Sequence, residues 1–251
     1  MPYEPNHPVF TLPQGGDQTI WRYIDLAKLV SLLKDRALYL SRADLLGDPY
    51  EGSTTRLVVE SRRAEFEEMG NPEFFALLTD VNRDSRLDTY VNCWHLSPHE
   101  SAAMWSQYAK QGVGVAIKAT VPRLTKNLTD QLLHLAQHVY VGEVHYVDYT
   151  GDWIPENNLY WPYVHKRKSF EHEKELRIVS HVFPDYEGGV DPSAIRPQGI
   201  TVPIDPDTLI TDLYVAPETG EWFREIVQAT AEKFGLERQV KRSSLDDDPV
   251  Y

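Results

Sequence analysis

The chain has 251 residues, of which 41% are hydrophobic and 25% charged, enough for one large domain with a sizeable core. It contains no run of eighteen apolar residues and no basic, apolar leader, so we expect neither a membrane span nor a secretory signal. The single cysteine fits a reducing cytoplasm, and a formal charge of −13 argues against broad affinity for nucleic-acid backbones.

The beginning of the chain predicts a strand, a helix and a second strand. Residues 1–18 are rich in proline and glycine and form an arm, and residues 19–24 form an apolar, aromatic strand. Asp25 caps a helix over residues 26–36, which carries one leucine-rich face. A strand over residues 37–42 then leads into a turn at residues 43–52.

The remaining elements alternate irregularly. The other predicted strands cover residues 90–95, 113–118, 139–149, 171–182, 201–204, 210–215 and 239–241. The other predicted helices cover residues 55–69, 72–86, 98–111, 121–137 and 218–234, with loops at 150–168 and 185–198. No doubly wound rhythm and no repeat is present, which favours an α+β fold with a mixed, mostly antiparallel sheet. We expect one domain over residues 19–243 and an acidic tail over 244–251.

The most informative segment is a row of charges near residue 175. If residues 171–182 form a strand, alternation places Glu171, Glu173, Glu175 and Arg177 on one face, about 7 Å apart in sequence order. Neighbouring carboxylates raise each other's pKa, whereas an arginine lowers the pKa of the acid beside it. The row predicts a site with one anionic carboxylate and one that can share a proton. The alternative is a solvent-facing edge with alternating charges.

A second cluster lies on the first two strands. It consists of Arg22 beside Tyr23, and Ser41 beside Arg42. An arginine on a core strand needs an anionic partner, because burying it unpaired costs several kcal/mol. The partner of Arg22 is therefore expected to be a glutamate of the later strand or the phosphate of a ligand.

A third cluster combines aromatic side chains with the cysteine. Trp105 and Tyr108 share a helix side that belongs either to the core or to a pocket rim that stacks on a flat cationic ring. Cys93 and His95 lack a complete zinc-ligand pattern, so we expect no metal site. Phosphate-binding loop and nucleophile-elbow motifs are absent. The basic run 165–168 is either a local nucleic-acid groove or a solvated edge.

Three blocks of the sequence resemble those of a widespread microbial family of uncharacterised function. The first joins Leu38-Tyr-Leu-Ser-Arg-Ala-Asp to Asp48-Pro-Tyr-Glu51, and the second joins Met104-Trp-x-x-Tyr108 to Gly112-Val-Gly-Val. The third is Phe170-x-x-Glu-x-Glu-x-Arg177, and Tyr214-Val-Ala-Pro217 adds a fourth short match.

The order of motifs is also remotely similar to that of the ADP-ribosyltransferase superfamily, which includes toxins that modify DNA. Arg22 on the first strand, Ser41 on the second and Glu173-x-Glu175 on a late strand occupy the superfamily's positions. The second strand lacks the Ser-Thr-Ser run of many such toxins, and Arg177 is outside the pattern.

The resemblance implies an NAD-consuming enzyme, a transferase or a glycohydrolase, that acts as a toxin or in phage defence. Arg22 would hold NAD, Ser41 would support the glutamate strand, and Glu175 would stabilise the oxocarbenium-like transition state. Glu173 would orient or deprotonate a protein or nucleic-acid acceptor. The candidate catalytic residues are Glu175 and Glu173, and the candidate NAD-binding residues are Arg22, Tyr23, Ser41, Arg42, Trp105, Tyr108 and Arg177.

Two other functions stay open. In the first, the protein is a non-catalytic ligand-binding or interaction module, and its arginines and glutamates form a structural ion-pair network. In the second, it is a metal-dependent hydrolase or nuclease that uses paired carboxylates.

Overall fold

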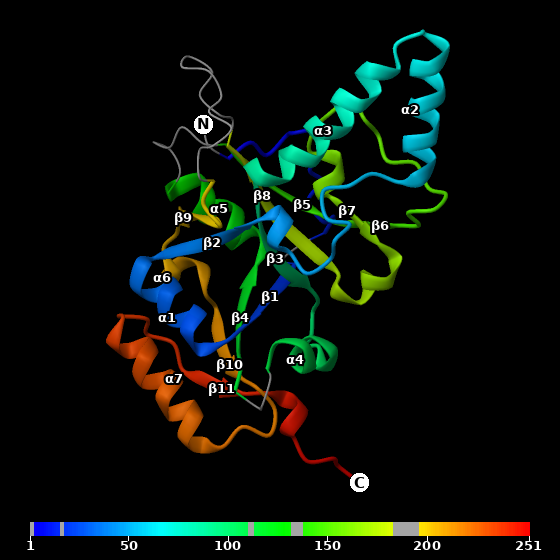
Figure 1. Ribbon diagram of the computed structural model, residues 1–251. Helices are drawn as coiled ribbons and strands as arrows, with labels where there is room; N and C mark the ends of the chain where they lie inside the picture. The colour runs from blue at the N-terminus through cyan, green and yellow to red at the C-terminus, as the bar shows by residue number, and fades with distance from the viewer. Residues whose placement is uncertain (1–2, 16–17, 110–112, 132–137, 183–195) are drawn as a thin grey trace.

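The computed structural model describes residues 3–15, 18–109, 113–131, 138–182 and 196–251 (Figure 1). Most of the loop predicted at 185–198 and the end of the helix predicted at 121–137 fall outside these ranges. Within them, strands from the whole length of the chain join one nine-stranded sheet, and a second sheet has two strands. No helix in these ranges is both long and apolar enough to cross a membrane.

The elements alternate irregularly along the chain, as expected. The strands of the large sheet are β1 (Thr19–Ile24), β2 (Ala37–Arg42), β3 (Thr89–Leu96), β4 (Val115–Thr120), β5 (Val139–Glu143), β8 (Glu175–His181), β9 (Gly199–Pro203), β10 (Asp212–Val215) and β11 (Val240–Arg242). The small sheet pairs β6 (His145–Val147) with β7 (His165–Arg167) in parallel. The helices are α1 (Leu26–Asp35), α2 (Arg56–Glu68), α3 (Pro72–Asp88), α4 (Ala102–Tyr108), α5 (Val121–Gln131), α6 (Pro206–Leu209) and α7 (Glu221–Lys233).

The predicted fold class is confirmed. Every pairing in the large sheet is antiparallel except that between β10 and β11. Three helices, α1, α5 and α7, pack their apolar faces against one side of this sheet and form the main core. On the other side, two smaller apolar clusters lie over different parts of the sheet, one around Phe10 and Tyr163 and the other around Tyr23 and Trp105.

Several predicted boundaries were wrong. The strand expected from residue 171 begins only at Glu175, because Lys168–Glu173 forms a 3₁₀ helix that ends at Lys174 in a left-handed conformation with φ of 40°. The helix expected at 98–111 covers only Ala102–Tyr108, where Ser101 caps its first turn. The strand expected at 139–149 is divided into β5 and β6, and the short elements β7 and α6 were not predicted.

The edge of β3 that faces β1 and β2 explains where the pocket lies. One edge of β3 pairs continuously with β8, from Thr89 to His95. The opposite edge is shared: β1 pairs with His95 and Leu96, and β2 pairs with Tyr90 and Val91. Residues 92–94 therefore pair with neither strand on this edge, and β1 and β2 leave an opening in the sheet beside them.

Candidate active site

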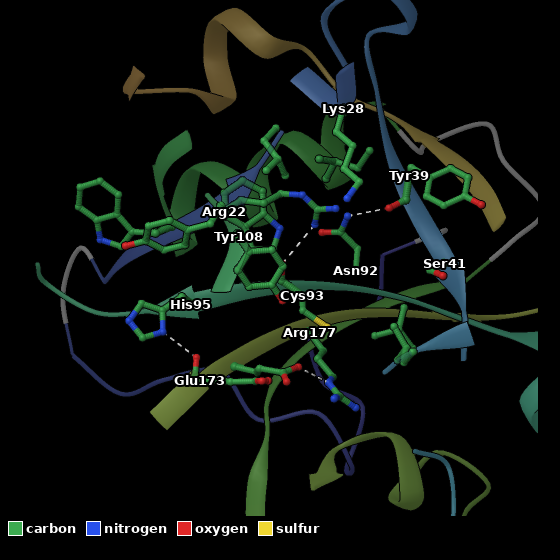
Figure 2. A pocket seen from close by; sticks show the side chains of 18 of the residues that line it. Arg22, Lys28, Tyr39, Ser41, Asn92, Cys93, His95, Tyr108, Glu173 and Arg177 are labelled. Carbon is green, nitrogen blue, oxygen red and sulfur yellow. Dashed lines mark hydrogen bonds and ion pairs between the residues drawn. The ribbon is translucent and has the colours of Figure 1, made fainter. Parts of the chain in front are cut away.

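A pocket of about 740 Å³ occupies this opening (Figure 2). Its lining comes from β1, α1, β2, β3, α4 and β8, and from the turn that contains Asp48 and Glu51. Lys166 of β7 and Glu173 of the 3₁₀ helix complete one wall. The size is within the range of about 300–1,000 Å³ that is usual for small-molecule sites.

Arg177 is the centre of a buried charge network on one face of the sheet. Its side chain has no exposed surface, and its Nε donates to Glu175 Oε2 at 2.6 Å. Its two terminal nitrogens donate to both carboxylate oxygens of Glu51, at 2.8 and 2.7 Å. A further bond of 2.9 Å reaches the carbonyl of Tyr163. The bidentate contact with Glu51 is the strongest form of arginine–carboxylate contact and fixes the orientation of that acid, while Glu175 receives a single bond.

Lys166 joins the two glutamates that the sequence singled out. Its Nζ donates to Glu173 Oε2 and to Glu175 Oε1, both at 2.6 Å, and all three side chains are buried. Gln107 of α4 lies 3.4 Å from the other oxygen of Glu173. Although Glu173 precedes the strand, its 3₁₀ turn brings it beside Glu175, so the predicted proximity of the two acids holds without the predicted alternation.

The two carboxyl groups have opposite pKa shifts. Burial alone would raise the pKa of Glu175, but the adjacent Arg177 and Lys166 outweigh burial and hold it well below its usual value. Burial and the neighbouring Glu175 raise the pKa of Glu173, against the effect of Lys166. Burial also opposes the charge of Lys166, yet Glu175 and Glu51 raise its pKa above the ordinary value. Glu175 is thus an anion, whereas Glu173 can hold a proton.

Arg22 lies on the opposite face of the sheet from this network, at the same opening. Its terminal nitrogen donates to the Cys93 carbonyl at 3.2 Å (Figure 2). Its guanidinium lies 6.0 Å from the centre of the Trp94 ring. Among the residues that the structure describes, no carboxylate forms an ion pair with it. Burial lowers its pKa. Of the two partners expected for Arg22, the glutamate is therefore not the one used.

Two polar residues of β3 complete the lining. Asn92 donates from Nδ2 to the Tyr39 carbonyl across the opening, while its buried Oδ1 has no partner in the described part of the chain. His95 is buried, and its Nδ1 donates to the Glu173 carbonyl at 2.6 Å, which leaves Nε2 as an acceptor. Burial lowers the pKa of His95 and favours this neutral form.

The other predicted site residues divide into two groups. Tyr23, Ser41 and Tyr108 line the pocket, and burial raises the pKa of both tyrosines to about 12. Ser41 pairs with Val91 of β3, which separates it from β8, and its hydroxyl lies 3.5 Å from the Arg42 carbonyl. The expected support of the glutamate strand by Ser41 is therefore not a direct contact.

Arg42 and Trp105, both expected to bind NAD, do not line the pocket. Arg42 binds Asp44 and the Arg196 carbonyl. Trp105 is buried in an apolar cluster, where its Nε1 donates to Glu100. The prediction that Arg42 and Trp105 line the pocket is therefore corrected. For Trp105, the alternative prediction of a core position describes its environment.

Glu51 and Lys166 are pocket residues that sequence reasoning did not select. Both belong to segments that the sequence patterns single out: Glu51 ends the turn that resembles a microbial family, and Lys166 lies in the basic run 165–168. The structure buries Lys166 within the charge network, where it pairs with Glu173 and Glu175, rather than on a solvated edge. Within the described residues, no three His, Cys, Asp or Glu side chains are grouped so that they could hold a metal ion.

Comparison with known proteins gives a family match over part of the chain. A family model described as "Protein of unknown function (DUF2971)" matches residues 104–178. The predicted likeness to a family of unknown function is confirmed over this stretch, which contains both the second block's Met104-Trp-x-x-Tyr108 and the glutamate block. No curated protein sequence matches the chain.

Two solved structures are similar in outline. One is Thermus sp. 2.9 DarT in complex with carba-NAD⁺, with 10% identity and a TM-score of 0.42, covering 93% of this chain and 98% of that one. The other is Thermus sp. 2.9 DarT in complex with ADP-ribosylated ssDNA, with 11% identity and a TM-score of 0.39, covering 90% and 93%. At TM-scores below 0.5, neither likeness establishes an activity for this chain.

Proposed function

We propose that the protein is an NAD-consuming enzyme, an ADP-ribosyltransferase or an NAD glycohydrolase, whose substrate occupies the pocket in the opened sheet. The observation that carries this proposal is that the Arg22 guanidinium forms no ion pair with a carboxylate of the described residues. Arg22 is half-buried and has no carboxylate partner among the described residues, and it lines a pocket that is large enough for a nucleotide. A diphosphate supplies the missing anion and can accept two parallel hydrogen bonds.

Glu175 supplies the second part of the chemistry. In the proposed reaction, the bond between ribose C1′ and the nicotinamide nitrogen breaks, and its electron pair leaves with nicotinamide. Positive charge then develops on the ribose, where a carboxylate that stays ionised stabilises it. Lys166 and Arg177 each donate to one oxygen of Glu175 and fix its position, and each oxygen keeps a lone pair for a ribose hydroxyl.

Glu173 is the residue placed to serve the acceptor. The acceptor's oxygen or nitrogen forms the new bond to C1′, and its proton passes to the Glu173 carboxylate. Water as the acceptor gives a glycohydrolase, whereas a protein or nucleic-acid group gives a transferase. A role as a toxin or in phage defence is consistent with either reaction, because both deplete NAD or modify a macromolecule.

The test measures nicotinamide release from NAD, together with binding of carba-NAD⁺, the ligand named for the DarT structure. Glu175→Gln is expected to slow release at least about 100-fold. Arg22→Met is expected to weaken carba-NAD⁺ binding by about tenfold or more. Arg123→Met, an arginine of α5 that does not line the pocket, is the matched control and is expected to change neither. A wild-type protein that neither binds carba-NAD⁺ nor releases nicotinamide would refute the proposal.

A second candidate is a non-catalytic binding module, favoured by one specific observation. Both oxygens of Glu175 are already engaged by buried cations, as a purely structural ion-pair network requires. In that case Glu175→Gln lowers the melting temperature clearly but leaves carba-NAD⁺ binding unchanged, and no nicotinamide release occurs in the wild type.

A further inference from the structure

A second pocket, of about 470 Å³, lies away from the opening in the sheet. The hairpin formed by α2 and α3 extends from the body of the protein (Figure 1). Residues of this hairpin and of the segment that contains Pro155 and Leu159 line the pocket. Apolar side chains supply much of its wall, including Val59 and Phe66 of α2 and Leu78 of α3. The volume is within the usual range for a small-molecule site.

One arginine of this pocket lacks an anionic partner. Arg86 of α3 makes no ion pair or side-chain hydrogen bond with any residue that the structure describes, and its Nε is buried. The hydroxyl of Thr54, which also lines the pocket, is a second buried polar atom without a partner in the described part of the chain. Buried polar groups in this state are uncommon, because each loses its water without replacement.

The other charges of the pocket do not satisfy Arg86. Arg62 pairs with Glu156, and Arg83 pairs with Asp80. Glu65 also lines the pocket, but it is exposed and forms no ion pair with Arg86. The Arg86 stem packs closely against the turn after β2, since a Cβ on Gly52 would lie 2.8 Å from the Arg86 Cγ. Among the residues that the structure describes, the pocket therefore presents an unpaired cation, Arg86, beside apolar walls.

We propose that this pocket is a second ligand site, which binds a small anion with an apolar body. The ligand's carboxylate or phosphate pairs with the Arg86 guanidinium, and its ring or chain packs against Phe66 and Leu78. The site is separate from the pocket of Arg22 and Glu175, and it does not depend on NAD chemistry.

The two pockets are nevertheless connected through Tyr163, which lines neither of them. Tyr163 is buried, and its carbonyl accepts from Arg177 in the charge network at 2.9 Å. Its hydroxyl lies 2.8 Å from the hydroxyl of Ser85, which lines the second pocket. Glu51 and Gly52 are adjacent in sequence, and each lines a different one of the two pockets.

The test uses benzoate and phenyl phosphate as probes and benzyl alcohol as their neutral counterpart, with binding to the intact protein followed by ligand-observed NMR. We expect at least one acid to saturate with a Kd of about 1–10 mM and the alcohol to bind about tenfold more weakly. Whichever acid binds more tightly identifies the head group that the site prefers.

Variants separate this site from the pocket in the sheet. Arg86→Met is expected to abolish the preference for the acids, whereas Arg22→Met is expected to leave it unchanged. Arg83→Met, an arginine of the same pocket that already has a partner, is expected to weaken the acids less than twofold. Circular dichroism shows whether each variant is folded, and Thr54→Val tests the same wall with a change that preserves shape. Equal binding of acid and alcohol, loss of binding in Arg22→Met but not in Arg86→Met, or no saturation by about 50 mM would overturn the proposal.

Discussion

Arg22 and Arg177 line the same pocket, and their surroundings are opposite. Arg177 has carboxylates on three of its nitrogens, while Arg22 has a carbonyl and an aromatic ring. A buried pair is strongly destabilised when one partner is removed, because the other charge remains uncompensated. Arg22 is half-buried and pairs with no carboxylate of the described residues, so its removal leaves no acid uncompensated. The two arginines should therefore respond differently to the same substitution.

The first prediction compares Arg177→Met with Arg22→Met in urea unfolding. Arg177→Met is expected to lower the free energy of unfolding by about 3–5 kcal/mol, since Glu51 and Glu175 lose their partner. Arg22→Met is expected to leave it unchanged or to raise it, because no carboxylate is left unpaired. Arg123→Met is the control for loss of an arginine outside the pocket. Equal losses in the two pocket variants would show that Arg22 has a structural partner.

The second prediction concerns pH and Glu173. Burial and Glu175 raise its pKa in the folded protein, whereas the unfolded value is about 4.3. Between these values the folded state binds more protons, so this group's contribution to stability is lost as the pH rises through that window. The stability of Glu173→Gln, relative to wild type, should then increase from about pH 4.5 to about pH 7.5. Urea midpoints at both pH values measure it, and a flat or falling difference would contradict the shift.

Among the elements, the segment between β2 and α2 supplies two acids that form ion pairs with arginines of other elements. Asp48 binds Arg167 with both carboxylate oxygens, and three residues later Glu51 binds Arg177. Gly52 follows with φ of 71°, and a Cβ there would lie 2.7 Å from the ring of Tyr163. The turn predicted from Gly-Asp-Pro-Tyr-Glu-Gly thus positions two buried acids, Asp48 and Glu51. The turn-forming residues predict the turn but not the burial of these acids.

The third prediction compares two glycines that flank α2. Gly52→Ala and Gly70→Ala both force a left-handed conformation, which costs about 1–2 kcal/mol. Only Gly52→Ala adds overpacking against Tyr163 and Arg86, of about 1–3 kcal/mol, because nothing lies within 4 Å of a Cβ at Gly70. Unfolding in urea measures both. Equal losses would mean that Tyr163 and Arg86 move aside at no cost in stability.

The sequence predicts those elements whose signal is local. Alternation in β1 and the leucine stripe and Asp25 cap of α1 are short-range features, and both elements lie where expected. The start of β8 was predicted too early, because Lys174 has a left-handed backbone and the strand begins only after it. A lysine in the sequence does not indicate a left-handed backbone. Glu173 therefore does not share a strand face with Glu175, as the predicted strand required. The 3₁₀ helix nevertheless places it beside Glu175.

At the scale of the whole molecule, β3 connects the parts of the fold. It pairs with β8 along one edge and with both β1 and β2 along the other, and six of its eight residues are buried. By contrast, α3 has no buried residue over its seventeen positions. Stability is expected to be unevenly distributed between the two.

The fourth prediction follows for amide hydrogen exchange measured by mass spectrometry. Peptides from β3 and β8 are expected to exchange only through global unfolding, whereas those from α3 exchange through local opening and much faster. Peptides from α5, a helix that packs on the main core, serve as the control for helical structure with buried contacts. Protection of α3 equal to that of β3 would contradict this distribution.

The candidate site was only partly predictable, for a reason of chain topology. Glu175 and Arg177 are two residues apart and could be read together, but Glu51 is 126 residues from the arginine that it binds. Lys166 belongs to a run of basic residues that, by composition, is typical of a surface. Their burial results from the assembly of β7, β8 and the turn after β2, which no local pattern encodes.

The position of Tyr163 has a consequence for any two molecules that occupy the two pockets. Its carbonyl accepts from Arg177 in one pocket's charge network, and its phenol contacts Ser85, which lines the other pocket. Any coupling that Tyr163 transmits between the two ligands must be reciprocal. If the ligand of one pocket changes the dissociation constant of the other ligand by some factor, the second ligand changes the dissociation constant of the first by the same factor.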